Sequence, residues 1–595
     1  MRPFAKHDHH TLRRGILVLG LIAGLASSAS AQLITDGNLL WQNGATNTVA
    51  AQFGTGAPTG TFLTACNATY GVTGYSAALL GTVTFTHNLA ANPLFKSAPQ
   101  YPNMNPSFVL APGSPAFTQA MVVPNDGFFE QVCYMGAIGP DPAGDWTKGW
   151  TYFDSLGAGR QDLHLVGMPD PRPLAIHDNI IARVDQFWGA DSNHLVRGQF
   201  RMDGGANLTI APGTVVFEER ATLGTIRIDR GSKIFAVGKV DSVIIITVDD
   251  APGTMRTGGG GGLVINGRAR VNNANTCVGD SAASEGGAIG FYGGNDDHDN
   301  SGALKYVRIE YAGKEITPNN ELNTFTNNGV GDGTYYEYLQ AHRGADDGYE
   351  VFGGTAQVKH LICSDGTDDG YDWQQGFRGK AQFVIVRGIA DLAPSGTQNG
   401  DKGIEADNND VAPYTQLVCS GRSNPTVSNF TIVGDRSRSG AQFPGSPAGI
   451  NLRRATAGAV LNSIVYNFKT SAFKIDDNVT WDAHCASRVT GPAVFCSSAT
   501  TGVPVGQGTV MITNSAPNPF RSKVAFNFTL PQAGRVQVQV FSADGRLIDT
   551  VQDGEMAAGQ HSLVWSSAAK QPAGVYFYKV LANGSQGSGK FVRVD

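Results

Sequence analysis

The stretches GADDGYEVFGG (residues 344–354) and GTDDGYDWQQG (residues 366–376) repeat one phrase, Asp-Asp-Gly-Tyr followed by an acidic residue, at an interval of 22 residues. Repetition at a short interval is typical of proteins built from stacked structural repeats. Side chains alternate along a strand, so Tyr349 and Val351 share one face and Glu350 lies on the other. We therefore expect each phrase to form a turn and a short strand of one coil, with glycine allowing the tight bend.

Two series of short apolar segments extend the repeat in both directions. One series begins at Gly348, Gly370, Gly403 and Gly449. The other consists of four-residue segments with an apolar first and fourth residue, and these begin at Tyr306, Tyr336, Val358, Phe383, Val427 and Leu461. The two series alternate in a fixed order along the chain. Two strands per period predict a right-handed parallel β-helix whose turns accept insertions of different length.

The composition agrees with an all-β protein. Glycine accounts for 76 of the 595 residues, near twice ordinary usage, while charged residues make up 16%. Frequent glycine suits short strands joined by tight turns. The formal net charge is -6, so the chain has no basic field that would hold a phosphate backbone, and nucleic acid is excluded as an expected partner.

The first 31 residues have the pattern of a signal peptide. Arg13 and Arg14 precede an apolar run over residues 15–26, and small residues follow at 29–31. The run is too short to span a bilayer, and no later segment is long and apolar enough. We expect an exported mature chain without a transmembrane segment.

The seven cysteines lack Cys-x-x-Cys spacing, which argues against a structural zinc site. In an oxidising compartment Cys485 and Cys496 are the favoured disulfide pair, and Cys66 with Cys133 is a second candidate.

The expected organisation is a signal peptide (1–31), a β-rich region of undefined fold (32–190), the β-helix (191–499), a linker (500–514) and an Ig-like domain (515–595). The last block has alternating strands with Asp-Gly and Asn-Gly turns, which indicate a small β-sandwich.

The closing block resembles the C-terminal sorting domain of the bacterial type IX secretion system and the related Ig-like domain of flagellar hook-capping proteins. The matching residues lie at 517–520, 544–546, 574–578 and 589–592. This resemblance implies export across the outer membrane, with the secretion machinery as a partner. The middle of the chain, with NLTIAPGTVV at 207–216 and DKGIEADNND at 401–410, is similar to secreted right-handed β-helix proteins that carry such domains. That similarity implies shape and a secreted or cell-surface location, without a defined activity.

Nine carboxylates fall at equivalent places of adjacent coils, where they must repel one another. They are Asp346, Asp347, Glu350, Asp368, Asp369, Asp372, Asp401, Glu405 and Asp407. Calcium would offset the repulsion, because it accepts six to eight oxygen ligands in tolerant geometry. Raised pKa values or basic partners such as Arg343, Arg378 and Lys402 would also offset it. A third interpretation is that the acids are turn residues at solvent-exposed bends.

Two classes of function stay open from the sequence. The first is a non-enzymatic binding or structural module with a cation-stabilised acidic face, where exposed aromatic rings stack on glycans. The second is a polysaccharide lyase or glycoside hydrolase acting on an acidic glycan. A lyase needs a cation and a base, for which Arg378 and Lys402 are candidates, and a hydrolase needs a pair of carboxylates. A second acidic cluster at residues 295–300 fits either an irregular cation loop or an Asx-rich turn.

Overall fold

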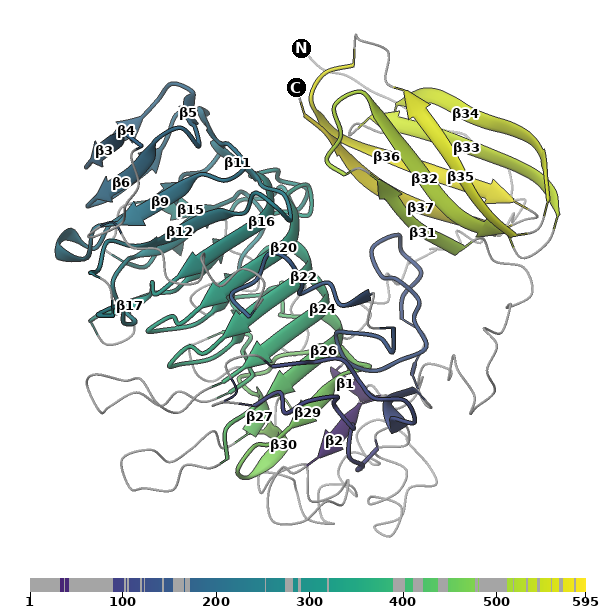
Figure 1. Cartoon of the computed structure of the whole chain (residues 1–595), viewed down its shortest axis with the longest axis horizontal. Coiled ribbons are helices and arrows are strands. Elements are labelled where there is room, and N and C mark those ends of the chain that lie inside the picture. The colour runs from purple at the N-terminus through teal and green to yellow at the C-terminus, as the bar shows by residue number, and fades with distance from the viewer. Residues whose placement is uncertain are drawn as a thin grey trace, which may run out of the picture.

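The chain is all-β in the computed structural model, which describes, with short gaps, residues 33–41, 89–153, 172–272, 282–388, 402–409, 421–436, 448–476 and 511–594. Parallel strands stack into two long sheets, and an antiparallel sandwich follows them (Figure 1). The predicted fold class, a parallel β-helix followed by an Ig-like sandwich, is confirmed. Within these ranges no helix is long and apolar enough to cross a membrane. The predicted signal peptide lies outside the described residues.

The coils of the β-helix place their strands in three parallel rows. The first row begins with β3 (Leu174–Asp178), β6 (Asn193–Arg197), β9 (Val215–Glu218) and β12 (Ile244–Val248). The second row is β4 (Ile181–Ala182), β7 (Gln199–Met202), β10 (Thr225–Ile228), β13 (Gly262–Asn266), β19 (Phe325–Asn328), β21 (Tyr349–Phe352), β23 (Tyr371–Gln374), β25 (Ile404–Ala406), β27 (Ala448–Leu452) and β30 (Ser471–Ile475). The third row begins with β5 (Gln186–Trp188), β8 (Asn207–Ile210) and β11 (Lys233–Val237).

In the later coils one long strand serves both the third and the first row. These strands are β16 (Gly302–Glu310), β20 (Tyr335–His342), β22 (Gln357–Ser364), β24 (Lys380–Arg387) and β26 (Thr426–Val433), followed by the separate β28 (Gly458–Leu461) and β29 (Ile464–Tyr466). The N-terminal part of β16 pairs with β11, and its C-terminal part pairs with β12. Each of these later coils therefore has two continuous strands, as predicted, and one of the two bends so that it belongs to two rows.

A residue in left-handed conformation makes this bend in each coil. Its φ lies between 49° and 59° at Tyr306, Tyr338, His360, Phe383 and Asn429. The first four rings stack along the helix, with centroid separations of 4.6, 4.4 and 5.3 Å between successive pairs. A left-handed conformation costs a non-glycine residue roughly 1–2 kcal/mol, and the stacked rings offset part of that cost.

The bend also corrects the predicted alignment of the apolar segments. The ladder pairs Leu304 with Tyr336, so Tyr306 is equivalent to Tyr338 and does not occupy the first inward position. Phe383 is shifted in the same way, because Ala381 pairs with Val358. The segment at Leu461 is shifted by one residue, since Val460 pairs with Val427. The sequence pattern hid these shifts because the bend residue breaks the two-residue alternation and is itself aromatic in several coils.

The repeated glycines are required by close packing, because a Cβ at these positions would clash with a neighbouring side chain. A Cβ on Gly370 would lie 2.1 Å from a methyl of Val386, and one on Gly403 would lie 2.0 Å from a methyl of Ile432. Neither glycine has a positive φ. The left-handed bends of the two phrases lie instead at Gly353, Gly354 and Gly376, whose φ values are 68°, 74° and 80°. Gly370 and Gly403 let an inward side chain of the neighbouring row reach the core.

Residues 89–153, which we call the N-terminal segment, cover the outer face of the sheet that contains the bent strands. Phe108, Ile138, Trp150 and Phe153 pack there in one cluster with Ile362, as well as Val243, Ile245, Ile385 and Val433. Farther upstream, β1 (Leu33–Asp36) pairs with β28 and β2 (Leu39–Trp41) with β29, so the start of the chain extends the far end of the same sheet (Figure 1). The parallel ladders begin at Leu174, before the expected start of the β-helix at residue 191.

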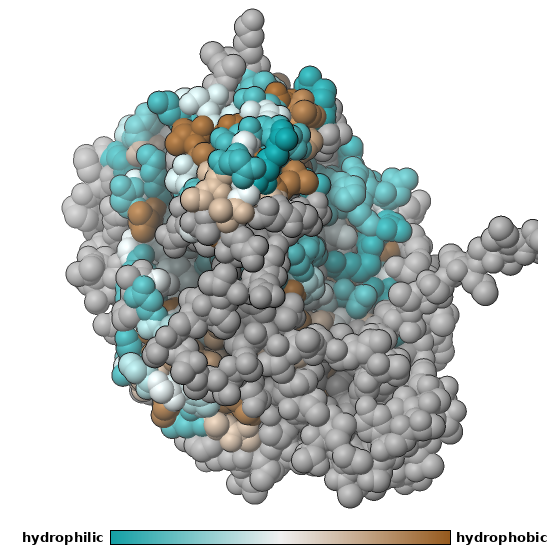
Figure 2. Space-filling view, turned by 90° about the vertical axis from the view of Figure 1, so that its right-hand side faces the viewer, coloured by the Kyte–Doolittle hydropathy of each residue, from teal (hydrophilic) through white to brown (hydrophobic). Residues whose placement is uncertain are grey.

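The C-terminal block is a sandwich of two antiparallel sheets around an aromatic core of Phe520, Phe526, Phe528, Trp565 and Phe591. One sheet contains β31 (Met511–Ala516), β32 (Lys523–Leu530) and β35 (Gly559–Ser566); the other contains β33 (Gly534–Ser542), β34 (Leu547–Met556), β36 (Gly574–Ala582) and β37 (Ser585–Arg593). On the side that carries this domain, apolar residues stand in small groups among hydrophilic ones (Figure 2).

Among the described cysteines, Cys133 is disulfide-bonded and Cys363 is a free, buried thiol. The favoured pair, Cys485 with Cys496, and the suggested partner Cys66 lie outside the described residues.

Candidate cation site

The acidic residues of the second row form a continuous stack. Glu350 of β21 is the register neighbour of Asp372 in β23, which neighbours Glu405 in β25 and then Asn451 in β27. The predicted alignment of these four residues is confirmed. The acidic stack, as the name is used below, also contains the acids next to these strands, and its members are Asp346, Asp347, Glu350, Asp368, Asp369, Asp372, Glu405 and Asp407. The ninth predicted residue, Asp401, lies outside the described residues.

The side chains of the acidic stack point away from the apolar core but are shielded from solvent. Exposed fractions are 6% for Asp347 and Glu350 and 8% for Asp346 and Asp372. Asp368 is half-buried. Tyr349 and Tyr371 fill the interior, as predicted. The interpretation of these acids as turn residues at solvent-exposed bends is therefore wrong, and their mutual repulsion is strengthened by the low local dielectric.

Three groups of carboxylates each bring one oxygen per residue within 4.8 Å of one another. They are Asp346–Asp347–Asp368, Asp347–Glu350–Asp372 and Asp369–Asp372–Glu405. Two oxygens bound to one Ca²⁺ at 2.3–2.6 Å lie at most about 5 Å apart. The oxygens of each group are therefore close enough to share one calcium ion.

The C-terminal side of the stack, which we call the paired half (Asp369, Glu405 and Asp407), carries its own cations. The ammonium of Lys402 lies 2.8 Å from Glu405 and 3.2 Å from Asp369. Arg453 donates to Glu405 and, at 2.7 Å, to Asp407, and Arg454 also reaches Asp407 at 2.7 Å. Burial acts to raise the pKa of Glu405, but Lys402 and Arg453 outweigh it and lower the value. Burial raises the pKa of Asp407 to about 6 against the opposing effect of Arg453.

The remaining acids, which we call the open half (Asp346, Asp347, Glu350, Asp368 and Asp372), have no ion pair with a cationic side chain among the described residues. Glu350 accepts hydrogen bonds from the neutral amides of Asn323 and, at 2.9 Å, of Gln374. Asp347 accepts from the backbone N–H of Asp369 at 3.0 Å.

Two oxygens in the open half, Asp346 Oδ2 and Asp372 Oδ1, are buried without a hydrogen-bond partner among the described residues. Burial, followed by the charge of neighbouring carboxylates, raises the pKa of Asp346, Asp347, Glu350 and Asp372 well above the usual range. A bound cation would remove both penalties, because it supplies positive charge and occupies the free oxygen lone pairs.

The basic residues considered as a lyase base are occupied. Burial acts to lower the pKa of Lys402, but Asp369 and Glu405 outweigh it and raise the value well above the usual range, so Lys402 stays protonated. Arg378 binds Asp297 at 2.9 Å in another part of the β-helix. Arg343, which was expected only as a basic partner of the acids, lies over the ring of Tyr311. Among these three, Lys402 alone contacts the acidic stack, and it does so as a cation.

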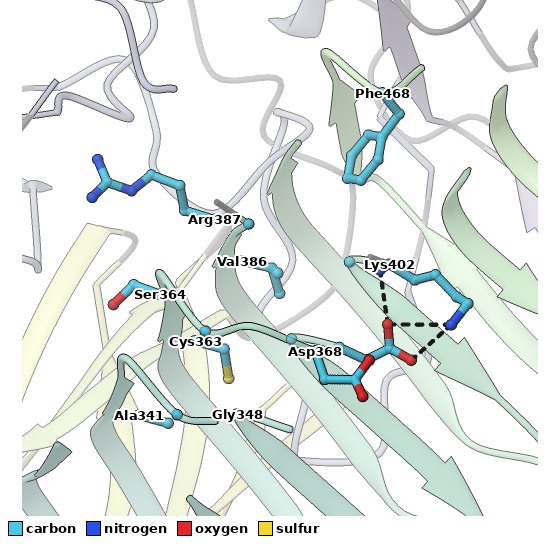
Figure 3. Close-up of a pocket in the computed structure, with 15 residues that line it drawn as sticks. Ala341, Gly348, Cys363, Ser364, Asp368, Val386, Arg387, Lys402 and Phe468 are labelled. Carbon is cyan, nitrogen blue, oxygen red and sulfur yellow. Dashed lines mark hydrogen bonds and ion pairs between the residues drawn. The ribbon is translucent and has the colours of Figure 1, made fainter. Parts of the chain in front are cut away.

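A narrow recess opens beside Asp368, Asp369 and Lys402 and has room for about one water molecule. In Figure 3, Lys402 bonds the carboxylate of Asp369 while Asp368 lies close by, below Phe468. The guanidinium of Arg387, which also lines the recess, points away from these acids and binds the fully buried Asp365. The recess therefore admits water or an ion, and it is too small for a sugar ring.

The second acidic cluster forms a turn. Asp297 is held by the guanidinium groups of Arg270 and Arg378. Asp296 accepts the backbone N–H of His298, and Asp299 binds the hydroxyl of Ser301. These internal partners favour the Asx-rich turn over the cation loop.

Sequence inspection missed the cations Arg453 and Arg454 and the amides Asn323 and Gln374. Arg453 follows β27 at the place where Asp407 follows β25. A search for opposite charges at equivalent repeat positions would have found it. The amides carry no charge and contact the stack only through folding, so no comparable signal marks them.

Comparison with known families agrees with this architecture. The profile described as a pectate-lyase-like β-helix domain matches residues 181–516, more than half of the chain. The chain belongs to the pectate-lyase-like β-helix family. A second profile, the FlgD Ig-like domain, matches residues 509–586 and covers the C-terminal sandwich. No curated protein matches the chain.

Two crystal structures of tailspike protein 2 show remote similarity. One is the enzymatically active domain from bacteriophage CBA120: identity is 10%, 67% of this chain and 72% of that chain are covered, and the TM-score is 0.19. The other is the full-length protein from an Escherichia coli O157:H7 bacteriophage, with 10% identity, 68% and 64% coverage and a TM-score of 0.12. At these TM-scores the likeness carries no argument about function.

Proposed function

We propose that this chain is an exported, cell-surface or secreted binding module whose β-helix is held together by calcium in the open half of the acidic stack. The proposal rests on two observations: carboxylate oxygens lie within 4.8 Å of one another in each of three groups, and two buried oxygens of the open half lack a described partner. Calcium suits such a set because it takes many oxygens at 2.3–2.6 Å in flexible geometry. Membership of the pectate-lyase-like β-helix family supports an acidic glycan as the bound partner.

Asp368 is the place where a glycan would meet the cation. It is half-buried, it belongs to one of the three-carboxylate groups, and it opens into the recess next to Lys402. A uronate carboxylate that reached this recess would add an oxygen to the cation and face the Lys402 ammonium, and its sugar ring would remain on the surface.

Binding of acidic polysaccharides in calcium and in chelator tests the glycan partner. We expect the chain from Gln32 onward to retard polygalacturonate or alginate only in calcium, and not to retard neutral dextran. Asp368→Asn should weaken this binding, whereas Asp553→Asn on the Ig-like domain should leave it unchanged. Calcium-independent binding, or equal binding of dextran, would contradict the proposal.

Binding is favoured over cleavage by the positions of the candidate groups. The carboxylates approach the spacing of about 5 Å used by retaining glycosidases, but Asp347, Glu350 and Asp372 are too deeply buried to meet a glycosidic bond. Lys402 is held as a cation by two acids and is not available as a base for a lyase. Release of unsaturated or reducing ends from the same polysaccharides would overturn this preference.

We also propose that the C-terminal Ig-like domain directs export through a type IX secretion system. Its support is the set of C-terminal motifs named above and the match to an Ig-like profile. Deleting the chain from Ala516 onward should leave the β-helix trapped in the periplasm. Normal delivery of the truncated protein to the cell surface would contradict the role of this domain as an export signal.

A further inference from the structure

The first coil of the β-helix has strand edges that no described strand covers. β3, β4 and β5 each pair with one strand of the following coil, and no described strand pairs with their other edge. They lie at one tip of the β-helix, at the end opposite β30 (Figure 1). At the far end, by contrast, β1 and β2 extend the sheet past β28 and β29. Free edges expose backbone N–H and C=O groups that can pair with another chain.

The same coil exposes large apolar side chains on all three rows and at a corner. The exposed fractions are 44% for Leu174, 46% for Ile176, 51% for Ile181, 68% for Val184 and 70% for Phe187. Edge strands of monomeric proteins are commonly guarded by lysine, proline or a bulge. Residues 174–182 contain none of these, and β3 pairs regularly with β6 along its whole length. An edge that exposes several large apolar side chains marks an interaction surface.

We propose that a second copy of this chain covers the edge, with β3 pairing antiparallel to β3 of that copy around Ala175. In this register Leu174 stands opposite Ile176. Arg172, which also donates to the carbonyl oxygen of Ala190 at 3.2 Å, stands opposite Asp178. Each apolar residue therefore meets an apolar residue and each charge meets its opposite, which a self-complementary two-fold interface requires.

The remaining two rows fit the same symmetry. A two-fold axis through the first row exchanges the second and third rows, so β4 of one copy faces β5 of the other. Ile181 then lies near Phe187, and these are the exposed apolar residues of the two strands. Close by, Arg183 and Asp185 balance each other in charge, which favours a copy of this chain over a strongly charged partner.

The interface is small, because the three strands contribute five, two and three residues. Stable interfaces bury about 800 Å² per partner. We therefore expect dimerisation in the micromolar range, measured by sedimentation of the chain from Gln32 onward between about 1 and 100 µM.

Three variants test the arrangement. Ile176→Lys should weaken the dimer by at least about tenfold, since it places charge on the apolar edge. The matched control is Val564→Lys, which alters another exposed residue (57%) on the edge strand β35 of the Ig-like domain and should leave the dimer intact. Arg172→Asp alone should weaken the dimer, and combining it with Asp178→Arg should restore it.

Failure of that restoration would exclude the proposed register. A chain that stays monomeric throughout the concentration range, or a dimer unaffected by Ile176→Lys, would overturn the proposal. Open-ended growth with concentration would also overturn it, because that indicates head-to-tail stacking rather than a closed two-fold pair.

Discussion

The two halves of the acidic stack place carboxylates at the same register positions but balance them differently. In the paired half, Lys402, Arg453 and Arg454 lie within ion-pair distance of the acids. In the open half, the contacts of Glu350 come from the neutral amides of Asn323 and Gln374, and Asp346 and Asp372 each keep an oxygen without a described partner. The negative charge of the paired half is thus neutralised by cationic side chains of the chain itself, whereas that of the open half needs protons or a cation from solution.

The largest effect is expected where a built-in cation is removed. Arg453→Ala should lower the free energy of unfolding of the β-helix by about 3 kcal/mol, because Glu405 and Asp407 would lose a buried guanidinium. Scanning calorimetry with and without calcium measures the loss. The matched control is Arg535→Ala in the exposed Arg535–Asp553 pair, which should have no measurable effect. Equal melting of the Arg453 variant and the parent would refute the division into halves.

The second-largest effect is expected from calcium, which should stabilise the β-helix only through the open half. At a concentration 100 times its dissociation constant, a ligand of the folded state stabilises by about 2.7 kcal/mol. Chelator should therefore lower the melting temperature of the parent chain. The double variant Asp346→Asn with Asp372→Asn removes one carboxylate from each three-carboxylate group of the open half and should lose this response, whereas Glu405→Gln should keep it. If Glu405→Gln lost the response to chelator and the double variant kept it, the cation would bind in the paired half instead.

The pH dependence of stability in chelator provides a third comparison. Burial and neighbouring acids raise the pKa of Asp346, Asp347, Glu350 and Asp372, so the folded chain binds more protons than the unfolded chain. Stability is then fully present below the unfolded pKa near 4 and falls as pH rises, by about 1.4 kcal/mol per pH unit for each extra proton held.

Calcium should abolish this fall, since the bound ion keeps the same carboxylates ionised in the folded state. Burial raises the pKa of Glu218, which is not a member of the stack, to about 8, and its contribution should remain in calcium as an internal reference. Denaturant unfolding between pH 4 and 8, with and without calcium, separates the two contributions. A slope that calcium does not change would show that protons, rather than a metal ion, balance the open half.

The smallest expected effect comes from making the paired half resemble the open one. Lys402→Met removes the cation next to Asp369 and Glu405 and should cost about 1 kcal/mol in chelator. Calcium should recover this loss, because Asp369, Asp372 and Glu405 already form a three-carboxylate group. A loss that calcium leaves unchanged would mean that this group does not accept an ion.

Much of the fold could be predicted because the coils repeat local chemistry. The spacing of Gly348 and Gly370, with tyrosine after each, indicated the second row and its inward face, and the stack from Glu350 to Asn451 followed from strand alternation. The bent strands were harder to align, because Tyr306 and Phe383 resemble core residues although they occupy the left-handed bend.

Long-range packing set the limit of prediction. The N-terminal segment covers the sheet through contacts such as Trp150 with Tyr306, which are separated by more than a hundred residues and leave no periodic signal. In the site, carboxylate positions were predictable, but their environment was not. Arg453 pairs with Asp407 across adjacent coils, and Asn323 reaches Glu350 from the preceding one.

Calorimetric titration of calcium into the chelator-treated chain from Gln32 onward tests the central claim most directly. The account predicts saturable binding that is lost in the double variant Asp346→Asn with Asp372→Asn and retained in Glu405→Gln. The two acids of the double variant supply the partnerless oxygens, so their loss removes ligands and charge together. Absence of calcium binding by the parent chain, or binding that the double variant retains, would contradict the account.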